Sequence, residues 1–360
     1  MRLLDRYLLG QFLAWLFASL LALVMLFIVI DLIERLDTFV DYKTPFPVIA
    51  RYYGYGLTTI LTQILPLSML LGAILSLGQL KKTNELTAMQ SAGQSPWRLA
   101  RPLLLAGLLL SAAQYVLNER YAPYHYVENK RILMEEIKKI STADRESQAN
   151  VRLIGGAGRF WVSQFYDARN AALRSVTLQA LAAPTIRWRI DADRASYQPD
   201  GTWRFERGYL RVFQDSTEYT MPFKEYVTTV LSEEPADFAR RNLDPFHAGM
   251  AELLRFARRV KESGGETQKH MTNFHLRASY PLSGVIMVLL GAGLGMRVIR
   301  GGNLALGIGV SLAIGFAFFG LIRVGQALGY NGTLPPAAAA WLGNVVFFLL
   351  AIFLFRRVAH

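Results

Sequence analysis

Six stretches without a charged side chain constrain this chain more than any other feature of its sequence. They cover residues 7–30, 52–80, 102–118, 278–296, 301–322 and 336–355. Each is close to the ~20 apolar residues that a helix needs to cross a bilayer. The sequence therefore predicts a polytopic α-helical membrane protein with six transmembrane helices. The first block is longer than the h-region of a secretory signal and lacks an A-x-A-like cleavage site, so we expect a retained anchor.

One charged segment separates the third block from the fourth. Residues 119–277 hold 21 of the 27 acidic residues. This distribution predicts three parts: residues 1–118 with transmembrane helices 1–3, an inserted soluble domain over 119–277, and residues 278–360 with helices 4–6. The chain would then have a three-plus-three arrangement of helices around one insert.

The insert has the pattern of a β-rich domain from about residue 151 to 240, with flanking helices. Short alternating segments occupy residues 159–166, 173–182, 186–191, 202–206 and 208–213, with turn signals at 167–170 and 198–201. Such spacing is typical of an antiparallel sandwich or open barrel. Alternation predicts that Phe160 and Val162, or Trp188 and Ile190, face the interior. Helical patterns over 121–140 and 251–265 flank this region.

Cations are distributed unevenly between the two sides of the predicted helices. The formal net charge of +12 would suggest a nucleic-acid partner in a soluble protein, but here position decides its meaning, and we expect no nucleic acid. Ten cations lie at the termini and on alternate loops: Arg2, Arg6, Lys81, Lys82, Arg98, Arg101, Arg297, Arg300, Arg356 and Arg357. The opposite short loops carry only Arg35, Lys43 and Arg51. The positive-inside rule then predicts cytoplasmic termini and, in a bacterium, a periplasmic insert.

The sequence offers no catalytic or metal-binding motif. It lacks the phosphate loop G-x-x-x-x-G-K-[ST], the H-E-x-x-H metal motif and the G-x-S-x-G elbow. Its histidines are scattered, and it has no cysteine. We therefore expect no catalytic residue, metal site or cofactor in this chain. The Gly-rich run at 291–295 lies at the end of an apolar block, where close helix packing explains it better than nucleotide binding.

The loop between the second and third blocks has more local pattern than a connector needs. Residues 83–93 predict a short helix that Thr83 or Asn84 caps, with Glu85 in its first turn. Leu86 and Met89 would share one face of this helix. Two interpretations remain open: the helix fills a groove in a cytosolic partner, or it lies along the membrane with its apolar face in the headgroups.

Residues 65–95, LPLSMLLGAILSLGQLKKTNELTAMQSAGQS, resemble the signature of the LptF/LptG family of lipopolysaccharide export permeases. In that family a proline-containing second span runs into a coupling helix of pattern E-[LI]-x-x-[ML]-x-[AS]-x-G. LDRYLL at 4–9 and the segment 242–264 agree with the family, the latter with its LptG branch. The resemblance covers essentially the whole chain.

This resemblance implies a permease subunit of an ABC-type exporter in the bacterial inner membrane. ATP would be bound by a separate cytosolic ABC ATPase dimer (LptB-like). Other implied partners are a paralogous permease (LptF-like), a single-span periplasmic subunit (LptC-like) and a periplasmic bridge protein (LptA-like), with lipopolysaccharide as cargo. The insert would resemble the family's periplasmic jelly roll. Glu85 would face the ATPase, with Leu86 and Met89 as its apolar contacts.

An anionic, acylated cargo calls for cations near the outer leaflet. The candidates for substrate binding are Arg35, Lys43, Arg51, Lys130, Arg131 and Arg323. For each, snorkelling toward headgroups or pairing with a nearby acid is the alternative. The family tends to place lysines at the outer end of the first span. This chain instead reads IVIDLIERLDTFVD at 28–41, where acids outnumber Arg35.

Two other functional classes fit parts of the sequence. A membrane-anchored periplasmic receptor or assembly scaffold would use the β domain and need no coupling helix. A lipid-modifying enzyme would need converging polar groups, and the sequence shows no clustered histidines or carboxylate pair.

Overall fold

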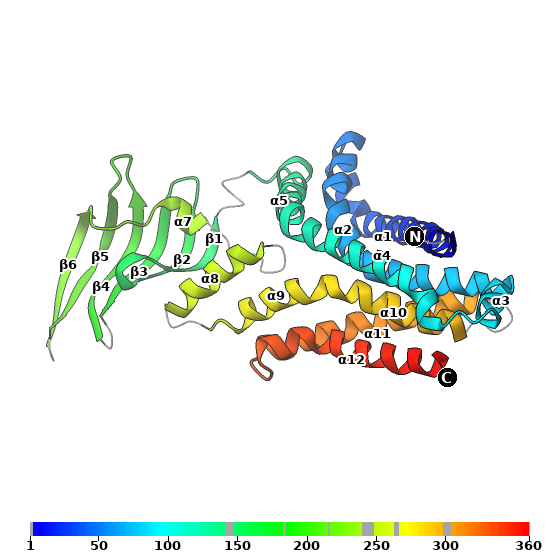
Figure 1. Ribbon diagram of the computed structural model, residues 1–360. Coiled ribbons are helices and arrows are strands. Elements are labelled where there is room, and N and C mark those ends of the chain that lie inside the picture. Colours follow the sequence, from blue (N-terminus) through cyan, green and yellow to red (C-terminus); the bar gives the residue numbers. More distant parts are fainter. Residues whose placement is uncertain are drawn as a thin grey trace. The chain divides into compact units, whose positions relative to one another are not determined.

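The computed structural model describes residues 3–141, 147–182, 185–214, 217–239, 248–262, 266–297 and 304–359 (Figure 1). The chain forms two compact units: Met1–Lys130 with Asp244–His360, here called the membrane unit, and Arg131–Leu243, here called the β unit. These boundaries follow from how the residues pack. The predicted boundaries at 118/119 and 277/278 instead mark where the apolar composition ends, and the predicted division of the chain stays a prediction. Arg2, Arg300 and the segment 240–247 lie outside the described residues.

Long helices build the membrane unit. In chain order they are α1 (Leu3–Asp41), α2 (Phe46–Lys82), α3 (Glu85–Ser91), α4 (Pro96–Val116), the π-helical η1 (Leu117–Tyr121), α5 (Ala122–Arg131), α8 (Met250–Glu262), α9 (Gln268–Ser279), η4 (Tyr280–Leu282), α10 (Ser283–Arg297), α11 (Leu304–Tyr330) and α12 (Pro336–Ala359). Six helices in the described residues are long and apolar enough to cross a membrane. The predicted polytopic fold class with six spans is confirmed.

Residues from opposite ends of the sequence meet at one end of this bundle, here called the inner end. Asp5 of α1 pairs with Arg98 of α4 at 3.0 Å. Lys81 Nζ donates to the carbonyl oxygen of Met296 at 2.6 Å, and the rings of Trp97 and Phe355 lie 4.3 Å apart. The start of α1, the α3 region and the ends of α10 and α12 therefore share one end, as six alternating spans require. Which membrane face this end occupies remains a prediction.

Helices α2 and α10 cross at very short range. A methyl group added to Gly291 would lie 2.7 Å from Ala73 Cβ and 2.9 Å from the carbonyl oxygen of Leu70. Gly295, one turn later, faces Leu77 and Ile74 in the same way. Small residues four apart let two backbones approach and gain dispersion contacts where lipid supplies no hydrophobic drive. The predicted role of the glycine run in close helix packing is confirmed.

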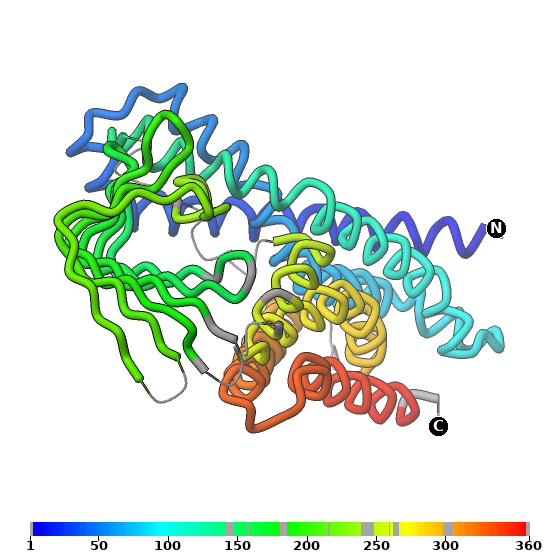
Figure 2. The backbone as a smooth tube through the Cα atoms, turned by 90° about the vertical axis from the view of Figure 1, so that its left-hand side faces the viewer, coloured from blue at the N-terminus to red at the C-terminus, as the bar shows by residue number. Residues whose placement is uncertain are grey.

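The β unit contains one antiparallel sheet. Its strands are β1 (Gln148–Ile154), β2 (Arg159–Asp167), β3 (Ala172–Ala182), β4 (Thr185–Tyr197), β5 (Trp203–Gln214) and β6 (Thr217–Thr228). Each pairs with its neighbour in sequence, in the order β1-β2-β3-β4-β5-β6 (Figure 2). The inserted β domain is confirmed. Among the described strands its topology is a meander, without the crossing connections of a two-sheet jelly roll.

Strand boundaries differ from the predicted segments in one instructive place. The predicted segments 202–206 and 208–213 form, from Trp203 onward, a single strand, β5, which continues through Arg207 at a positive φ of 51°. Gly208 follows because any side chain there would collide with the backbone oxygen of Asp191 on β4. The Arg-Gly pair thus marks an irregularity inside a strand rather than a turn between strands.

Aromatic side chains fill the interior of the β unit. Trp161, Trp203 and Phe205 are fully buried, and Phe238 of α7 (Pro235–Ala239) packs edge-on against Trp161. The predicted inward face of β2 is wrong, because the buried residues of this strand are Arg159, Trp161, Ser163 and Tyr166 rather than Phe160 and Val162. Ile190 of β4 is buried as predicted.

Arg159 can lie inside the β unit because the segment after β6 satisfies its guanidinium. Its Nε donates to Glu233 at 3.1 Å. Its terminal nitrogens donate to the carbonyl oxygen of Val230 at 3.0 Å and to Ser232 Oγ at 2.7 Å. Burial of a charge is tolerated when it is paired and hydrogen-bonded in this way.

We expect Gly291→Ala to destabilise the membrane unit by about 1–3 kcal/mol, because the added methyl group must push α2 away from α10. Thermal unfolding of the purified protein in detergent, followed by tryptophan fluorescence, measures the loss. The matched control is Gly320→Ala in α11, where an added methyl group meets nothing within 4 Å. Equal unfolding temperatures for the two variants would contradict the close crossing.

Candidate functional site

The short helix predicted between the second and third spans is present, and it spans Glu85–Ser91 rather than 83–93. Helix α2 ends at Lys82, and Asn84 turns the chain with a positive φ of 62°. Asn84 makes no capping hydrogen bond through its side chain. Gly93, with φ of 82°, lies just beyond α3, where a left-handed residue ends a helix.

Glu85 accepts two hydrogen bonds at the start of α3. Tyr7 of α1 donates to Oε2 at 2.5 Å, and Thr83 donates to Oε1 at 2.8 Å. The hydrogen bond from Tyr7, followed by that from Thr83, lowers the pKa of Glu85. A lowered pKa means that these contacts are fully formed above the ordinary carboxyl range and weaken as the pH falls through the lowered value. Glu85 is therefore a charged, partly exposed carboxylate at neutral pH.

The apolar face of α3 packs against this chain's own helices. Leu86 is 1% exposed and belongs to the same buried cluster as Leu8 and Phe12 of α1. Met89 packs partly buried against that cluster. This face of α3 is thus covered by the chain's own helices. Leu86 is not available for the partner contact that the resemblance implied, and the exposed side chains of α3 are Thr87, Ala88, Gln90 and Ser91.

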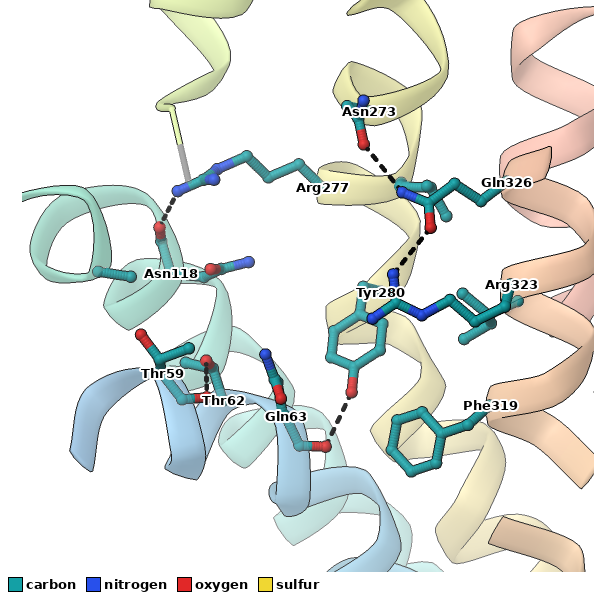
Figure 3. A pocket seen from close by; sticks show the side chains of 13 residues that line it. Thr59, Thr62, Gln63, Asn118, Asn273, Arg277, Tyr280, Phe319, Arg323 and Gln326 are labelled. Atoms are coloured by element: carbon teal, nitrogen blue, oxygen red, sulfur yellow. Dashed lines mark hydrogen bonds between the residues drawn. The ribbon is translucent and has the colours of Figure 1, made fainter. Parts of the chain in front are cut away.

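A second candidate site is a cavity of about 120 Å³ inside the membrane unit (Figure 3). It lies between α2, η1 with α5, α9 with η4, and α11. Most of its lining surface is apolar, and polar side chains from each of these segments face into it. The lining residues are Thr59, Thr62, Gln63, Asn118, Ala122, Asn273, Leu276, Arg277, Tyr280, Phe319, Ile322, Arg323 and Gln326. Polar and ionisable groups inside a membrane bundle mark paths or binding sites by default.

Hydrogen bonds join the polar groups on one side of this cavity. Arg323 Nη1 donates to Gln326 Oε1 at 2.9 Å, and Gln326 Nε2 donates to Asn273 Oδ1 at 3.2 Å. Gln326 Nε2 also donates to Tyr330 Oη at 2.8 Å. Tyr280, from η4, donates to the carbonyl oxygen of Gln63 at 2.8 Å. These bonds hold α9, η4, α11 and α2 in fixed register around the cavity.

An ion pair closes another side of the cavity. Arg277 Nε lies 3.1 Å from Glu119 Oε2, with side-chain exposures of 5% and 30%. Arg277 also donates to the carbonyl oxygen of Asn118 in η1, where the π-helical turn changes the usual i to i−4 bonding. Glu119 Oε1 accepts from the backbone N–H of Met250, the first residue of α8, at 2.8 Å. A carboxylate at a helix start satisfies an otherwise unpaired donor and complements the helix dipole.

Of the six candidate substrate cations, Arg323 is the one that lines this cavity. Arg35 donates to Asp31 at 3.0 Å and lies over the Tyr52 ring at 5.6 Å. Lys43 and Arg51 are exposed near the turn between α1 and α2. Lys130 lies over the Tyr126 ring at 4.9 Å, and Arg131 pairs with Glu136 at 3.4 Å.

Sequence reasoning missed Arg277, Asn273 and Gln326 as cavity residues, and Glu119 as the partner of Arg277. Arg277 and Glu119 directly border charge-free stretches, which is the signal that drew attention to Arg323, and Asn273 and Gln326 lie close to such borders. Their convergence depends on the packing of α9 against α11 and η1, which a single sequence does not reveal.

Comparison with known proteins gives a consistent picture. The family model "Lipopolysaccharide export system permease LptF/LptG" matches residues 6–357. "Lipopolysaccharide export system permease protein LptG" of Escherichia coli (strain K12) is 22% identical over 327 residues, covering 84% of this chain and 86% of that protein. The protein of the same name from Haemophilus influenzae is 22% identical over 369 residues, covering 98% of each.

Glu119→Ala should lower the stability of the membrane unit by about 3 kcal/mol, because it leaves the buried Arg277 guanidinium without its carboxylate. Unfolding in detergent measures this loss. The control is Glu34→Ala, an exposed acid of α1, for which we expect less than about 1 kcal/mol. The double variant Glu119→Leu/Arg277→Met should recover part of the loss, since it removes the uncompensated charge. No recovery would show that the packing of Glu119, not its charge, matters.

Proposed function

Since the chain belongs to the LptF/LptG family of lipopolysaccharide export permeases, we propose that it is the permease subunit of an ABC-type exporter that extracts lipopolysaccharide from the inner membrane. The match over residues 6–357 carries this proposal. Family membership covers the spans, the coupling region and the inserted domain together. A receptor or scaffold would need only an anchor and a ligand-binding domain, and would leave the cavity and the α3 contacts without a role.

ATP hydrolysis in a separate cytosolic ATPase dimer supplies the energy in this proposal. Glu85 is the group through which the ATPase engages α3, because it is charged, partly exposed and fixed at the first turn. Leu86 and Met89 contribute differently from the original expectation. They anchor α3 to the spans, so that a force on α3 reaches α1 and α2. This chain binds no nucleotide and performs no catalysis in the proposed mechanism.

The cargo carries acyl chains and phosphates, so its path needs apolar walls and cations. Helices α1, α4 and α11 expose large apolar side chains, among them Leu109 at 72% and Phe316 at 76%. These faces suit acyl chains and a paralogous, LptF-like permease. Arg323 is the strongest candidate for a phosphate contact. Lys43, Arg51, Lys130 and Arg131 remain candidates, whereas Arg35 must first release Asp31.

The inserted domain passes the cargo onward in this proposal, to an LptC-like subunit and an LptA-like bridge. Strand β6 is an edge strand with mostly exposed residues, including Tyr219 and Met221. An exposed edge can accept another strand through backbone hydrogen bonds. Pro222 lies in β6 and removes one donor from it, so pairing along this edge is incomplete.

Glu85→Ala tests the coupling role. We expect the variant to assemble with the ATPase in native membranes and to lose ATP-driven release of lipopolysaccharide from proteoliposomes by at least about tenfold. Gln90→Ala, an exposed position on the same helix, is the matched control and should keep release near the wild-type level. Full release by Glu85→Ala would exclude the coupling role. Purification without an ATPase, and no ATP-dependent activity, would favour the scaffold.

Orientation can be tested directly because the chain has no cysteine. We propose cytoplasmic termini, a cytoplasmic α3 and a periplasmic β unit. Single cysteines at Gln90 and at Tyr219 should then label oppositely with a membrane-impermeant maleimide. In intact spheroplasts the β6 position reacts, and the α3 position reacts only after lysis. Labelling of the α3 position from outside would end the proposal, since a cytosolic ATPase would have no access to it.

A further inference from the structure

We infer that Tyr7 is a positioning residue that fastens α1 to α3, so that displacement of α3 tilts α1 about its crossing with α2. This inference rests on the proposed function, because it assumes that an ATPase moves α3. It adds a route by which that motion crosses the membrane. The route begins at a hydroxyl group that neither binds cargo nor contacts the ATPase.

Several attachments hold the inner end of α1 to the α3 region. Tyr7 donates to Glu85 Oε2 at 2.5 Å, and two residues earlier Asp5 pairs with Arg98 in the first turn of α4 at 3.0 Å. Leu8, the next residue after Tyr7, shares a buried apolar cluster with Leu86. Polar and apolar contacts thus meet within one turn of α1. The apolar cluster keeps α1 and α3 in contact, and the hydrogen bond from Tyr7 fixes their relative position.

Tyr7 is the contact that links α1 to the acid proposed to meet the ATPase. Its ring is rigid and its side chain has only two torsions, so a displacement of Glu85 is passed to the backbone of α1 with little loss. Glu85 keeps the hydrogen bond from Thr83 at 2.8 Å when Tyr7 is changed. Glu85 is also partly exposed, and water can replace the lost donor. Removing the hydroxyl therefore loosens the connection without leaving a buried, unpaired charge.

The crossing of α1 with α2 determines which motion is possible. A methyl group at Gly72 would lie 2.9 Å from Leu16 Cα and 3.0 Å from Leu16 Cβ. Ser19 Oγ donates to the carbonyl oxygen of Ser68 at 3.2 Å, one turn further along. Because the two backbones already touch here, α1 cannot move closer to α2. Tilting about this contact remains available.

Helix α1 is stiff enough to transmit a tilt. It runs without interruption from Leu3 to Asp41 and contains no proline, the usual cause of a sharp kink. Tyr7 lies nine residues before Leu16, or ~14 Å along the axis, and Val40 lies twenty-four residues after it, or ~36 Å. A shift of ~2 Å at Tyr7, typical of helix displacements, becomes ~5 Å in the opposite direction at Val40.

The outer end of α1 is held by contacts that can yield. Tyr53 of α2 donates to Asp31 at 3.0 Å, and Phe39 packs edge-on against Tyr52 with centroids 6.1 Å apart. Beyond these contacts the helix surface is open, with Ile33 68% and Val40 64% exposed. The outer arm of α1 can therefore move after a few contacts break.

The experiment measures the motion at the outer end in the assembled transporter. Spin labels at Val40→Cys in α1 and Val324→Cys in α11, both more than half exposed, report their distance by pulsed electron spin resonance. Measurements are made without nucleotide and with the ATPase trapped by ATP and vanadate. We expect a shift of ~5 Å between the two states in the labelled parent. In Tyr7→Phe the shift should fall to less than half, while assembly and the ATPase rate stay within about twofold.

Two controls separate this inference from the proposed function. Tyr209→Phe, an equally conservative change in the β unit, should leave the shift intact. A label at Gln90→Cys in α3, measured against Val324→Cys, reports whether α3 itself moves. If no ATPase associates, or α3 does not respond to nucleotide, the proposed function fails. If α3 responds and the outer end does not, or if Tyr7→Phe retains the full shift, the role of Tyr7 is wrong.

Discussion

Close contact between α2 and α10 is the constraint on which the membrane unit depends. In a bilayer, apolar side chains gain no free energy by moving from lipid to a helix interface. Helices therefore associate through van der Waals packing, which requires their backbones to approach closely. Gly291 and Gly295 permit this approach. The apolar windows of α2 and of α9 with α10 are accordingly 72% and 83% buried, whereas those of α1 and α11 are 17% and 22% buried. The bundle thus has a tightly packed centre and a loosely covered periphery.

Polar groups supply what apolar packing cannot, which is a fixed register between helices. Asn273, Gln326 and Tyr330 form mutual hydrogen bonds between α9 and α11. Ser279 donates to the carbonyl oxygen of Ala340 on α12. Each bond satisfies a group that lipid could not solvate, so sliding one helix along another would leave donors unpaired. Asn273 and Gln326 also line the cavity, and structure and proposed transport therefore share these two side chains.

Sequence patterns predicted those features that a single segment determines. Charge-free runs predicted the spans because apolar stretches of this length are best solvated by lipid. The glycine run predicted a close helix crossing because its place at the end of a span does not suit the alternative, nucleotide binding. The short helix at α3 followed from its acid, its turn residues and its length. Strand positions in the middle of the sheet followed from alternation. Family resemblance added the proposed partners, the proposed cargo and the proposed role of Glu85.

Features that depend on two distant segments were missed or mistaken. Arg159 faces the interior of the β unit because Glu233, 74 residues away, pairs with it, and alternation alone placed Phe160 there. Leu86 is buried because α1 covers it. Strands β1 and β6 escaped notice since they lie at the edges of the sheet, where burial is slight and Pro222 is tolerated. The cavity needs side chains from four regions of the sequence, at 59–63, 118–122, 273–280 and 319–326.

Glu119 has an architectural consequence. Glu119 lies in η1, where the chain leaves the bundle. It pairs with Arg277 of α9 and caps α8 at Met250, and both of these helices belong to the part of the chain that returns to the bundle. The chain ends that bound the insertion are therefore held together by the host bundle itself, whatever folds between them. Closing a loop costs little when its ends are already joined, and the cost grows slowly with loop length. Such a base can carry domains of different size, so the bundle and its inserted domain are free to diverge at separate rates.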